Sequence, residues 1–197
     1  MEKQQKYTIG IDLGGTNTVF GIVDAQGTIV AQDSMKTQAY ETAEAFVEAG
    51  VARLVPLISK VGGLDAIAGM GIGAPNANFY TGAIETAPNI TWAHERTVPL
   101  AKMFSEQLSS LDSRQKEPFP VRITNDANAA AMGEMAYGAA RGMKNFIVIT
   151  LGTGVGSGIV INGQLVYGHD GFAGELGHVT MVRGKEGRAC GCGRTGC

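Results

Sequence analysis

The chain has three cysteines, and all of them lie in its last eight residues, at Cys190, Cys192 and Cys197. His178 lies twelve residues before the first of them. Thiolate sulfurs and a histidine nitrogen are common ligands of tetrahedral zinc. The C-x-C pair is tighter than the usual C-x2-C spacing, so the spacing alone suggests a Cys3His zinc site without establishing one. Since imidazole has two ring nitrogens, His178 can bind zinc through one and a ligand through the other.

Two glycine-rich segments, 9–30 and 147–168, share one pattern at an offset of about 138 residues. Each is predicted to be a strand, a Gly-Thr turn, a second strand, a second turn and a third strand. Glycine has no Cβ, so such a turn lets backbone N–H groups approach an anion. An ordinary hairpin is the better explanation of either turn alone, but the matched pair favours a polyphosphate site. The predicted phosphate-binding residues are Gly14, Gly15, Thr16, Asn17, Gly152, Thr153 and Gly154.

Neither turn belongs to the dinucleotide or P-loop type. A strand, not a helix, follows "GTGVGSG", and no G-K-[ST] follows either turn. Asp12 ends the first predicted strand, beside the first turn. A carboxylate there would repel phosphate unless a cation lay between them, so we assign Asp12 to Mg²⁺, through water. The alternative is an aspartate that only caps the turn.

The predicted elements alternate between strands and helices, which is typical of an α/β protein with parallel pairing. The segment from about Thr42 has helical periodicity, with a kink expected at Pro56 and the end at Gly62-Gly63. The segment between "GIGAP" and Pro99 is predicted to be a long loop. The remaining predicted strands are 7–13, 18–23, 28–37, 66–75 and 120–124, and the remaining predicted helices are 99–110 and 125–140.

Composition excludes several classes of protein. The 197 residues include 44% hydrophobic and 17% charged residues, which indicates a globular chain with a real core. The formal net charge of −2 gives no basic face for nucleic acid. No apolar run reaches the ~20 residues of a membrane span, and the polar start lacks the apolar region of a signal peptide. We therefore expect a cytoplasmic protein, in which reduced cysteines favour a metal over a disulfide.

Five motifs together carry a resemblance to a known family. "IDLGGTNT" and "TLGTGVGSG" resemble the two phosphate motifs of the superfamily of actin, heat-shock chaperones and sugar kinases. "NDANAAAMGE", "GFAGELGH" and "CGCGRTGC" narrow the resemblance to the ROK family of sugar kinases and sugar-responsive repressors, over essentially the whole of Tyr7–Cys197. The resemblance implies a ribonuclease H-like, actin-like α/β fold with duplicated hairpin-containing lobes. The smaller lobe would be 1–122, and 123–197 would begin an incomplete larger lobe.

The resemblance also implies roles for individual residues. Asp126 matches the family's catalytic base, although the residues alone favour a simple helix cap. Asn125 would bind the same sugar hydroxyls as Asp126. Glu175 and His178 would contact the sugar, and His178 would also complete the zinc site with the three cysteines. The remaining sugar-binding residues carried over are Asn89 and, more weakly, Gly73.

The implied activity is phosphorylation of a hexose by ATP, with Mg²⁺ and a structural zinc, as in bacterial glucokinases. An N-acetylglucosamine or N-acetylmannosamine kinase is an alternative, because no motif fixes the size of the sugar pocket. A sugar-sensing repressor would need an N-terminal helix-turn-helix, for which no room precedes Tyr7. The resemblance also implies a homo-oligomer, a dimer or larger. Since the family continues beyond the last cysteine, we expect these residues to be a fragment with little or no activity alone.

Overall fold

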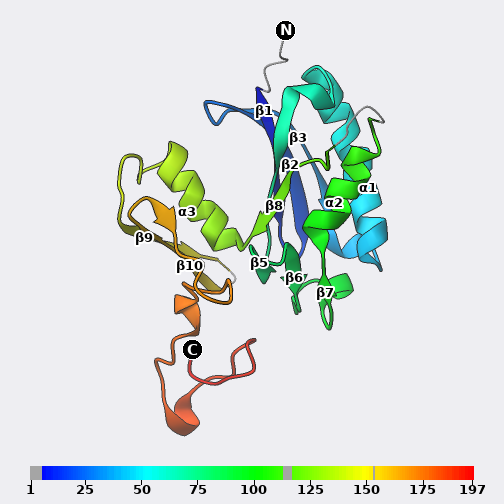
Figure 1. Cartoon of the computed structure of the whole chain (residues 1–197). Helices are drawn as coiled ribbons and strands as arrows, with labels where there is room; N and C mark the ends of the chain where they lie inside the picture. The colour runs from blue at the N-terminus through cyan, green and yellow to red at the C-terminus, as the bar shows by residue number, and fades with distance from the viewer. Residues whose placement is uncertain (1–5, 113–116, 153) are drawn as a thin grey trace. The chain divides into compact units, whose positions relative to one another are not determined.

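The computed structural model describes residues 6–112, 117–152 and 154–197. Its contacts divide the chain into two compact units, Met1–Asp126 and Ala127–Cys197. Figure 1 shows the course of the chain from the N-terminus to the C-terminus. Each unit is considered by itself below.

The first unit is built on a five-stranded sheet in the order β3-β2-β1-β4-β8. Strands β1 (Tyr7–Leu13), β2 (Asn17–Asp24) and β3 (Ile29–Lys36) form an antiparallel meander, as the sequence predicts. Strands β4 (Ile67–Gly73) and β8 (Val121–Thr124) lie parallel to β1. The third strand ends at Lys36, one residue before the predicted limit, because Thr37–Ala39 forms a 3-10 turn, η1.

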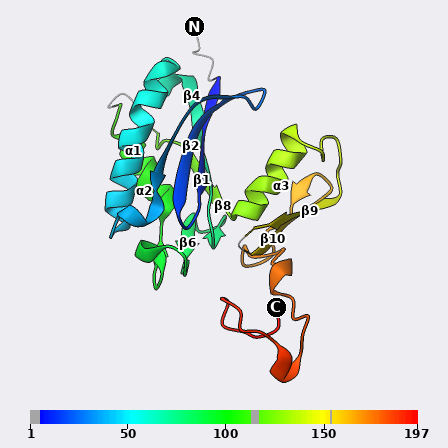
Figure 2. The ribbon, with the colours of Figure 1, turned by 180° about the vertical axis from the view of Figure 1, so that it is seen from behind.

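Two helices cover one face of this sheet, and both views of the ribbon show them side by side (Figures 1 and 2). Helix α1 (Ala43–Lys60) begins at an N-cap, Thr42, whose hydroxyl accepts a hydrogen bond from the Ala45 N–H at 3.1 Å. The helix continues through Pro56 and ends where Gly63 donates to the Ile58 carbonyl. Helix α2 (Leu100–Ser109) packs against α1 and β8. The fully buried phenylalanines of this core are Phe20, Phe46, Phe104 and Phe119.

The segment predicted to be one long loop contains a small sheet of β5 (Ala77–Asn78), β6 (Ala83–Glu85) and β7 (Thr97–Val98). Asn78 is buried and organises its first turn, because its side chain accepts from the Tyr80 N–H at 2.9 Å. A 3-10 turn, η3 (Thr91–Ala93), buries Trp92. The prediction of a plain loop was wrong because strands of two or three residues are too short to show a period.

The second unit holds an antiparallel sheet in the order β11-β10-β9, from β9 (Phe146–Leu151), β10 (Val155–Ile161) and β11 (Gln164–Leu165). The strand-turn-strand-turn-strand pattern of the first unit therefore recurs, as predicted from the internal repeat. Helix α3 (Asp126–Tyr137) ends three residues before the predicted limit. Beyond β11, the unit contains the 3-10 turns η4 (Leu176–His178) and η5 (Gly184–Glu186). Among the described helices, none has the length and apolarity needed to cross a bilayer.

Helix α3 approaches β10 closely because small residues meet there. A Cβ at Gly158 would lie 2.5 Å from the Ala131 Cβ and 2.9 Å from the Ala127 carbonyl oxygen. We expect Gly158→Ala to lower the free energy of unfolding by about 1–3 kcal/mol, the usual cost of overpacking. Gly133, in α3, is the matched control, because a Cβ there meets no atom within 4 Å. Gly133→Ala should raise stability by about 0.5–1 kcal/mol. Chemical denaturation of both variants tests the pair, and equal effects would contradict the packing described.

Candidate functional site

Four of the predicted site residues meet at one edge of the first unit's sheet. Asp12, at the end of β1, is in register with Gly73, at the end of β4. Gly73 is in register with Thr124, the last residue of β8, and Asn125 and Asp126 follow directly. Ligands of α/β sheets bind where the carboxyl ends of parallel strands meet. Asp12, Gly73 and the Asn125-Asp126 pair lie more than 50 positions apart in the sequence, and only strand pairing brings them together.

The Asp126 carboxylate affects the ionisation of Asp12. Partial burial raises the pKa of Asp12 above its usual value, and repulsion from the nearby Asp126 carboxylate raises it further. A cation at this edge would relieve both effects, because positive charge stabilises the ionised form. The shift therefore fits the prediction that Asp12 serves a bound cation.

The raised pKa of Asp12 predicts how its carboxylate affects the stability of the fold at different pH values. The folded chain holds the Asp12 proton more tightly than the unfolded chain, so the charged carboxylate is a penalty on folding at neutral pH. This penalty disappears as the pH falls below the unfolded pKa of ~4. We expect Asp12→Asn, without Mg²⁺, to stabilise the chain slightly at pH 7, because solvent screens much of the repulsion between the two carboxylates. The gain should vanish near pH 3.

A second aspartate provides the control for that measurement. A hydrogen bond from the Ser34 N–H and the Arg53 guanidinium lower the pKa of Asp33. Asp33 therefore favours folding in its charged form, and Asp33→Asn should lower stability at pH 7. Thermal unfolding at several pH values measures both variants. A loss of stability in Asp12→Asn at neutral pH would contradict the raised pKa of Asp12.

The first glycine turn, 14–16, is held by backbone and side-chain hydrogen bonds. Gly14 donates to the Asn17 carbonyl at 3.0 Å, and the Thr37 hydroxyl donates to the Gly14 carbonyl at 2.7 Å. The Asn17 side chain accepts a hydrogen bond from the Lys36 ammonium at 2.8 Å. Sequence reasoning missed Lys36, which adds a positive charge beside the turn. Thr16 and Asn17 are exposed, as a ligand-binding turn requires.

The Asn89 segment lies directly against this turn. A Cβ at Gly15 would come within 3.1 Å of the Asn89 carbonyl oxygen and 3.2 Å of the Asn89 Cβ, so the close approach needs glycine. Asn89 itself is exposed. The residue predicted to bind sugar and the turn predicted to bind phosphate are thus neighbours in the folded unit.

The second glycine turn lies between β9 and β10, and Thr153 falls outside the described residues. Gly152 donates to the Gly154 carbonyl at 2.9 Å. A Cβ at Gly152 or Gly154 would meet no atom of the described residues within 4 Å. Packing within the described chain therefore does not explain these glycines, whereas the approach of an anion to the backbone would.

Glu175 and His178 lie on one 3-10 turn, where residues three apart are nearly eclipsed. His178 Nε2 is 4.0 Å from Glu175 Oε2. His178 Nδ1 faces the other way and is 3.5 Å from Cys190 Sγ. The imidazole therefore has one nitrogen on the side of Glu175 and the other on the side of the cysteines, as its predicted double role requires.

The three cysteines and His178 converge. Their ligand atoms all lie within 4.8 Å of one another. Ideal tetrahedral zinc, with bonds of ~2.3 Å to sulfur and ~2.0 Å to nitrogen, separates two sulfurs by about 3.8 Å and sulfur from nitrogen by about 3.5 Å. The Cys192 Sγ–Cys197 Sγ distance is 3.7 Å, and the Cys190 Sγ–His178 Nδ1 distance is 3.5 Å. The donor set and its spacing fit zinc.

The charges within this cluster also favour a cation. Hydrogen bonds from the Arg194 backbone and side chain lower the pKa of Cys192 to about 6. Desolvation and the neighbouring thiols raise the pKa of Cys197 to about 11. Thiolates this close repel one another, so one ionises at the expense of the next. A divalent cation would stabilise all of them as thiolates.

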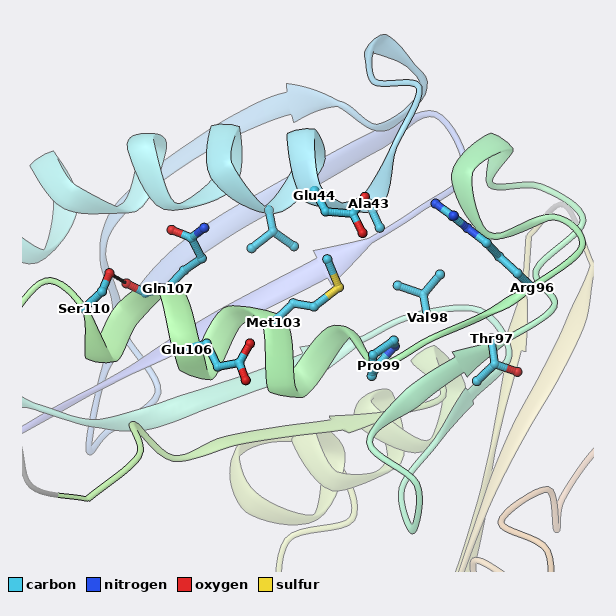
Figure 3. Close-up of a pocket in the computed structure, with 11 residues that line it drawn as sticks. Ala43, Glu44, Arg96, Thr97, Val98, Pro99, Met103, Glu106, Gln107 and Ser110 are labelled. Carbon is cyan, nitrogen blue, oxygen red and sulfur yellow. Dashed lines mark hydrogen bonds between the residues drawn. The ribbon is translucent and has the colours of Figure 1, made fainter.

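A groove of about 540 Å³ opens between the start of α1 and helix α2 (Figure 3). Glu44 lies at the start of α1, Met103 points toward it from α2, and Arg96 lies at the end of the groove beyond Val98. None of the predicted site residues lines it. The groove is therefore not part of the candidate site.

The chain is similar to known proteins over nearly its whole length. A family model described as "ROK family" matches residues 8–197. The chain is 41% identical over 191 residues to a glucokinase of Streptomyces coelicolor, covering 96% of the chain and 54% of that protein. It is 32% identical over 197 residues to the xylose repressor of Bacillus subtilis, covering 99% of the chain and 47% of that protein.

Among solved structures, a ROK family glucokinase from Streptomyces griseus, in complex with glucose and AMPPNP, superimposes with a TM-score of 0.77. The two chains are 38% identical, and the match covers 97% of this chain and 55% of that one. The chain thus spans about half the length of the curated relatives it matches.

Proposed function

The chain belongs to the ROK family, and we propose that the full-length protein transfers the γ-phosphoryl group of ATP to a hexose, with glucose as the substrate and its 6-hydroxyl as the acceptor. One observation carries the proposal: Asp12, Gly73 and Asp126 meet at one sheet edge, in the unit that also holds the first glycine turn. The glucokinase relative and the glucose complex of another relative support the same activity.

The proposed reaction needs positioning, charge stabilisation and a proton acceptor. Asp126 accepts the proton of the sugar hydroxyl as that oxygen attacks the γ-phosphorus, and ADP leaves when the bond to the β-phosphate oxygen breaks. Asp12 would hold Mg²⁺ through water, and the ion would neutralise phosphate charge. Asn89, Asn125 and Glu175 hydrogen-bond the sugar. The backbone N–H groups of both glycine turns hold the phosphates.

We also propose one structural zinc at Cys190, Cys192, Cys197 and His178. Four protein ligands leave no open position on the metal, so the zinc has no step in the chemistry. Its role is to fix His178, and with it the 3-10 turn that presents Glu175. The fit of the donor distances to tetrahedral zinc supports this assignment.

We also propose a lobe organisation, a cellular location and an oligomeric state for the full-length protein. Residues 1–122 form the smaller lobe of the kinase and 123–197 begin the larger lobe, with one phosphate turn in each. The protein acts in the cytoplasm as a homo-oligomer. Light scattering after gel filtration of the full-length protein measures the oligomeric state.

A coupled assay of ADP release by the full-length protein tests the activity. The sugars are glucose, mannose, fructose, N-acetylglucosamine and N-acetylmannosamine. We expect turnover with glucose to exceed turnover with either acetylated sugar. Turnover only with an acetylated sugar would keep the mechanism and replace the substrate. No turnover with any sugar, in a folded protein that contains zinc, would refute the kinase and favour a sugar-binding regulator like the matched repressor.

A further inference from the structure

The 3-10 turn η1, between β3 and α1, contacts two segments that are far apart in sequence. Its first residue, Thr37, donates from its N–H to the Thr16 carbonyl at 3.0 Å and from its hydroxyl to the Gly14 carbonyl at 2.7 Å. Thr37 is fully buried, and its hydroxyl also lies 2.9 Å from the Thr18 hydroxyl. Thr37 thus fixes η1 against the first glycine turn.

The next residue, Gln38, joins that turn to the Asn89 segment. Its Nε2 donates to the Gly15 carbonyl at 2.8 Å and to the Asn89 carbonyl at 2.5 Å. Its Oε1 accepts from the Thr91 N–H at 3.2 Å and from the Thr91 hydroxyl. Both amide hydrogens and both oxygen lone pairs are therefore used, in a side chain that is otherwise exposed.

These bonds join surfaces that already touch. Gly15 packs against Asn89 so closely that a Cβ would lie 3.1 Å from its carbonyl oxygen. Next to this contact, the buried Trp92 packs against Phe46 in a tilted arrangement, with ring centroids 4.7 Å apart. The Asn89 segment is thus anchored on the core at one end and on Gln38 at the other. A displacement of Asn89 by a ligand would be transmitted to the Gly15 turn through this direct contact and through the Gln38 side chain, which bonds to both carbonyl oxygens.

We propose that Gln38 is a positioning residue that couples the two halves of the site, so that sugar bound at Asn89 and phosphate bound at the 14–16 turn raise each other's affinity. The proposal rests on the proposed function, because it takes Asn89 as a sugar ligand and the turn as a phosphate ligand. Such coupling is reciprocal and typically changes affinities ~5–150-fold. The position requires glutamine, since glutamate has no hydrogen to donate and would face two carbonyl oxygens.

The kinetic test uses the full-length protein with Gln38→Ala and Gln38→Glu. The KM for glucose is measured at low and saturating ATP, and the KM for ATP at low and saturating glucose. In the wild type, we expect each saturating substrate to lower the KM of the other at least ~5-fold. The coupling factor is the ratio of a KM at low second substrate to the same KM at saturating second substrate. In both variants this coupling factor should fall towards one, and the KM for glucose should rise about tenfold while kcat changes less.

Gln32 provides the matched control. It is exposed on β3 and paired with Gly21, within the same meander. Gln32→Ala and Gln32→Glu make the same chemical changes and should leave the coupling factor unchanged. A wild-type coupling factor of one, or unchanged coupling in the Gln38 variants, would overturn the proposal.

Hydrogen exchange tests the role of Gln38 independently of the proposed kinase activity, because the measurement needs no turnover. We expect Gln38→Ala to speed amide exchange in peptides covering both 14–17 and 87–93, at least severalfold, while Gln32→Ala has no effect. Unchanged exchange in either peptide refutes the connection itself. If the wild type phosphorylates none of the sugars, the proposed function fails, and coupled binding of sugar and AMPPNP, measured by calorimetry, then decides between coupling and its absence.

Discussion

Replacing Asp126 with asparagine is expected to lower kcat for glucose phosphorylation by about 10³-fold, within the ~10²–10⁴ range of general-base catalysis. Asparagine has the same shape and can still hydrogen-bond the sugar, but it cannot accept the hydroxyl proton. The KM for glucose should therefore change less than threefold. A stopped or coupled assay at saturating ATP measures both parameters.

The same substitution distinguishes catalysis from helix capping. Asp126 is the first residue of α3, and asparagine is as good as aspartate at a helix start. The fold should therefore lose no more than about 1 kcal/mol, from the weaker interaction with the helix dipole. Asp33→Asn is the control for removal of a carboxylate, because Asp33 lies on β3 and is paired with Arg53 at 3.3 Å. A tenfold or smaller loss in kcat for Asp126→Asn would refute the base assignment.

Loss of the proposed zinc is also expected to cause a large loss of activity. Cys192→Ser removes one of the four ligands, and we expect the purified full-length variant to contain less than a tenth of the wild type's zinc. Structural zinc sites contribute folding energy directly, so the loops from η4 to Cys197 should lose their order. Since these loops hold Glu175 and His178, activity should fall at least ~100-fold. Elemental analysis and the coupled assay measure the two effects.

Lowering the pH should also remove zinc from the wild type and lower its activity. Zinc requires thiolates, so protons compete with the metal and its affinity falls as the pH falls.

Asp126→Asn is the control for Cys192→Ser, because it should remain zinc-loaded and folded while inactive. A Cys192→Ser variant that lacks zinc and retains full activity would refute the structural role, and a wild type without zinc would refute the site.

Much of this protein follows from short stretches of sequence. The two glycine hairpins, helix α1 and the Cys3His set could all be predicted, because each is encoded by residues close together in the chain. Turn residues, hydrophobic period and ligand spacing act locally, so no knowledge of distant contacts is required. The resemblance to the ROK family added roles for residues such as Asp126 that the residues alone would have assigned to a helix cap.

Only the tertiary structure decided how these pieces meet. Asp12, Gly73 and Asp126 share an edge because β4 and β8 add to β1 in one register, and that register depends on pairing between distant strands. The two nitrogens of His178 point to different partners because the last loop folds back upon η4. Gln38 gave no signal in the sequence, since an exposed glutamine has no periodic or motif pattern. Its four hydrogen bonds exist because folding brings Gly15, Asn89 and Thr91 to one side chain.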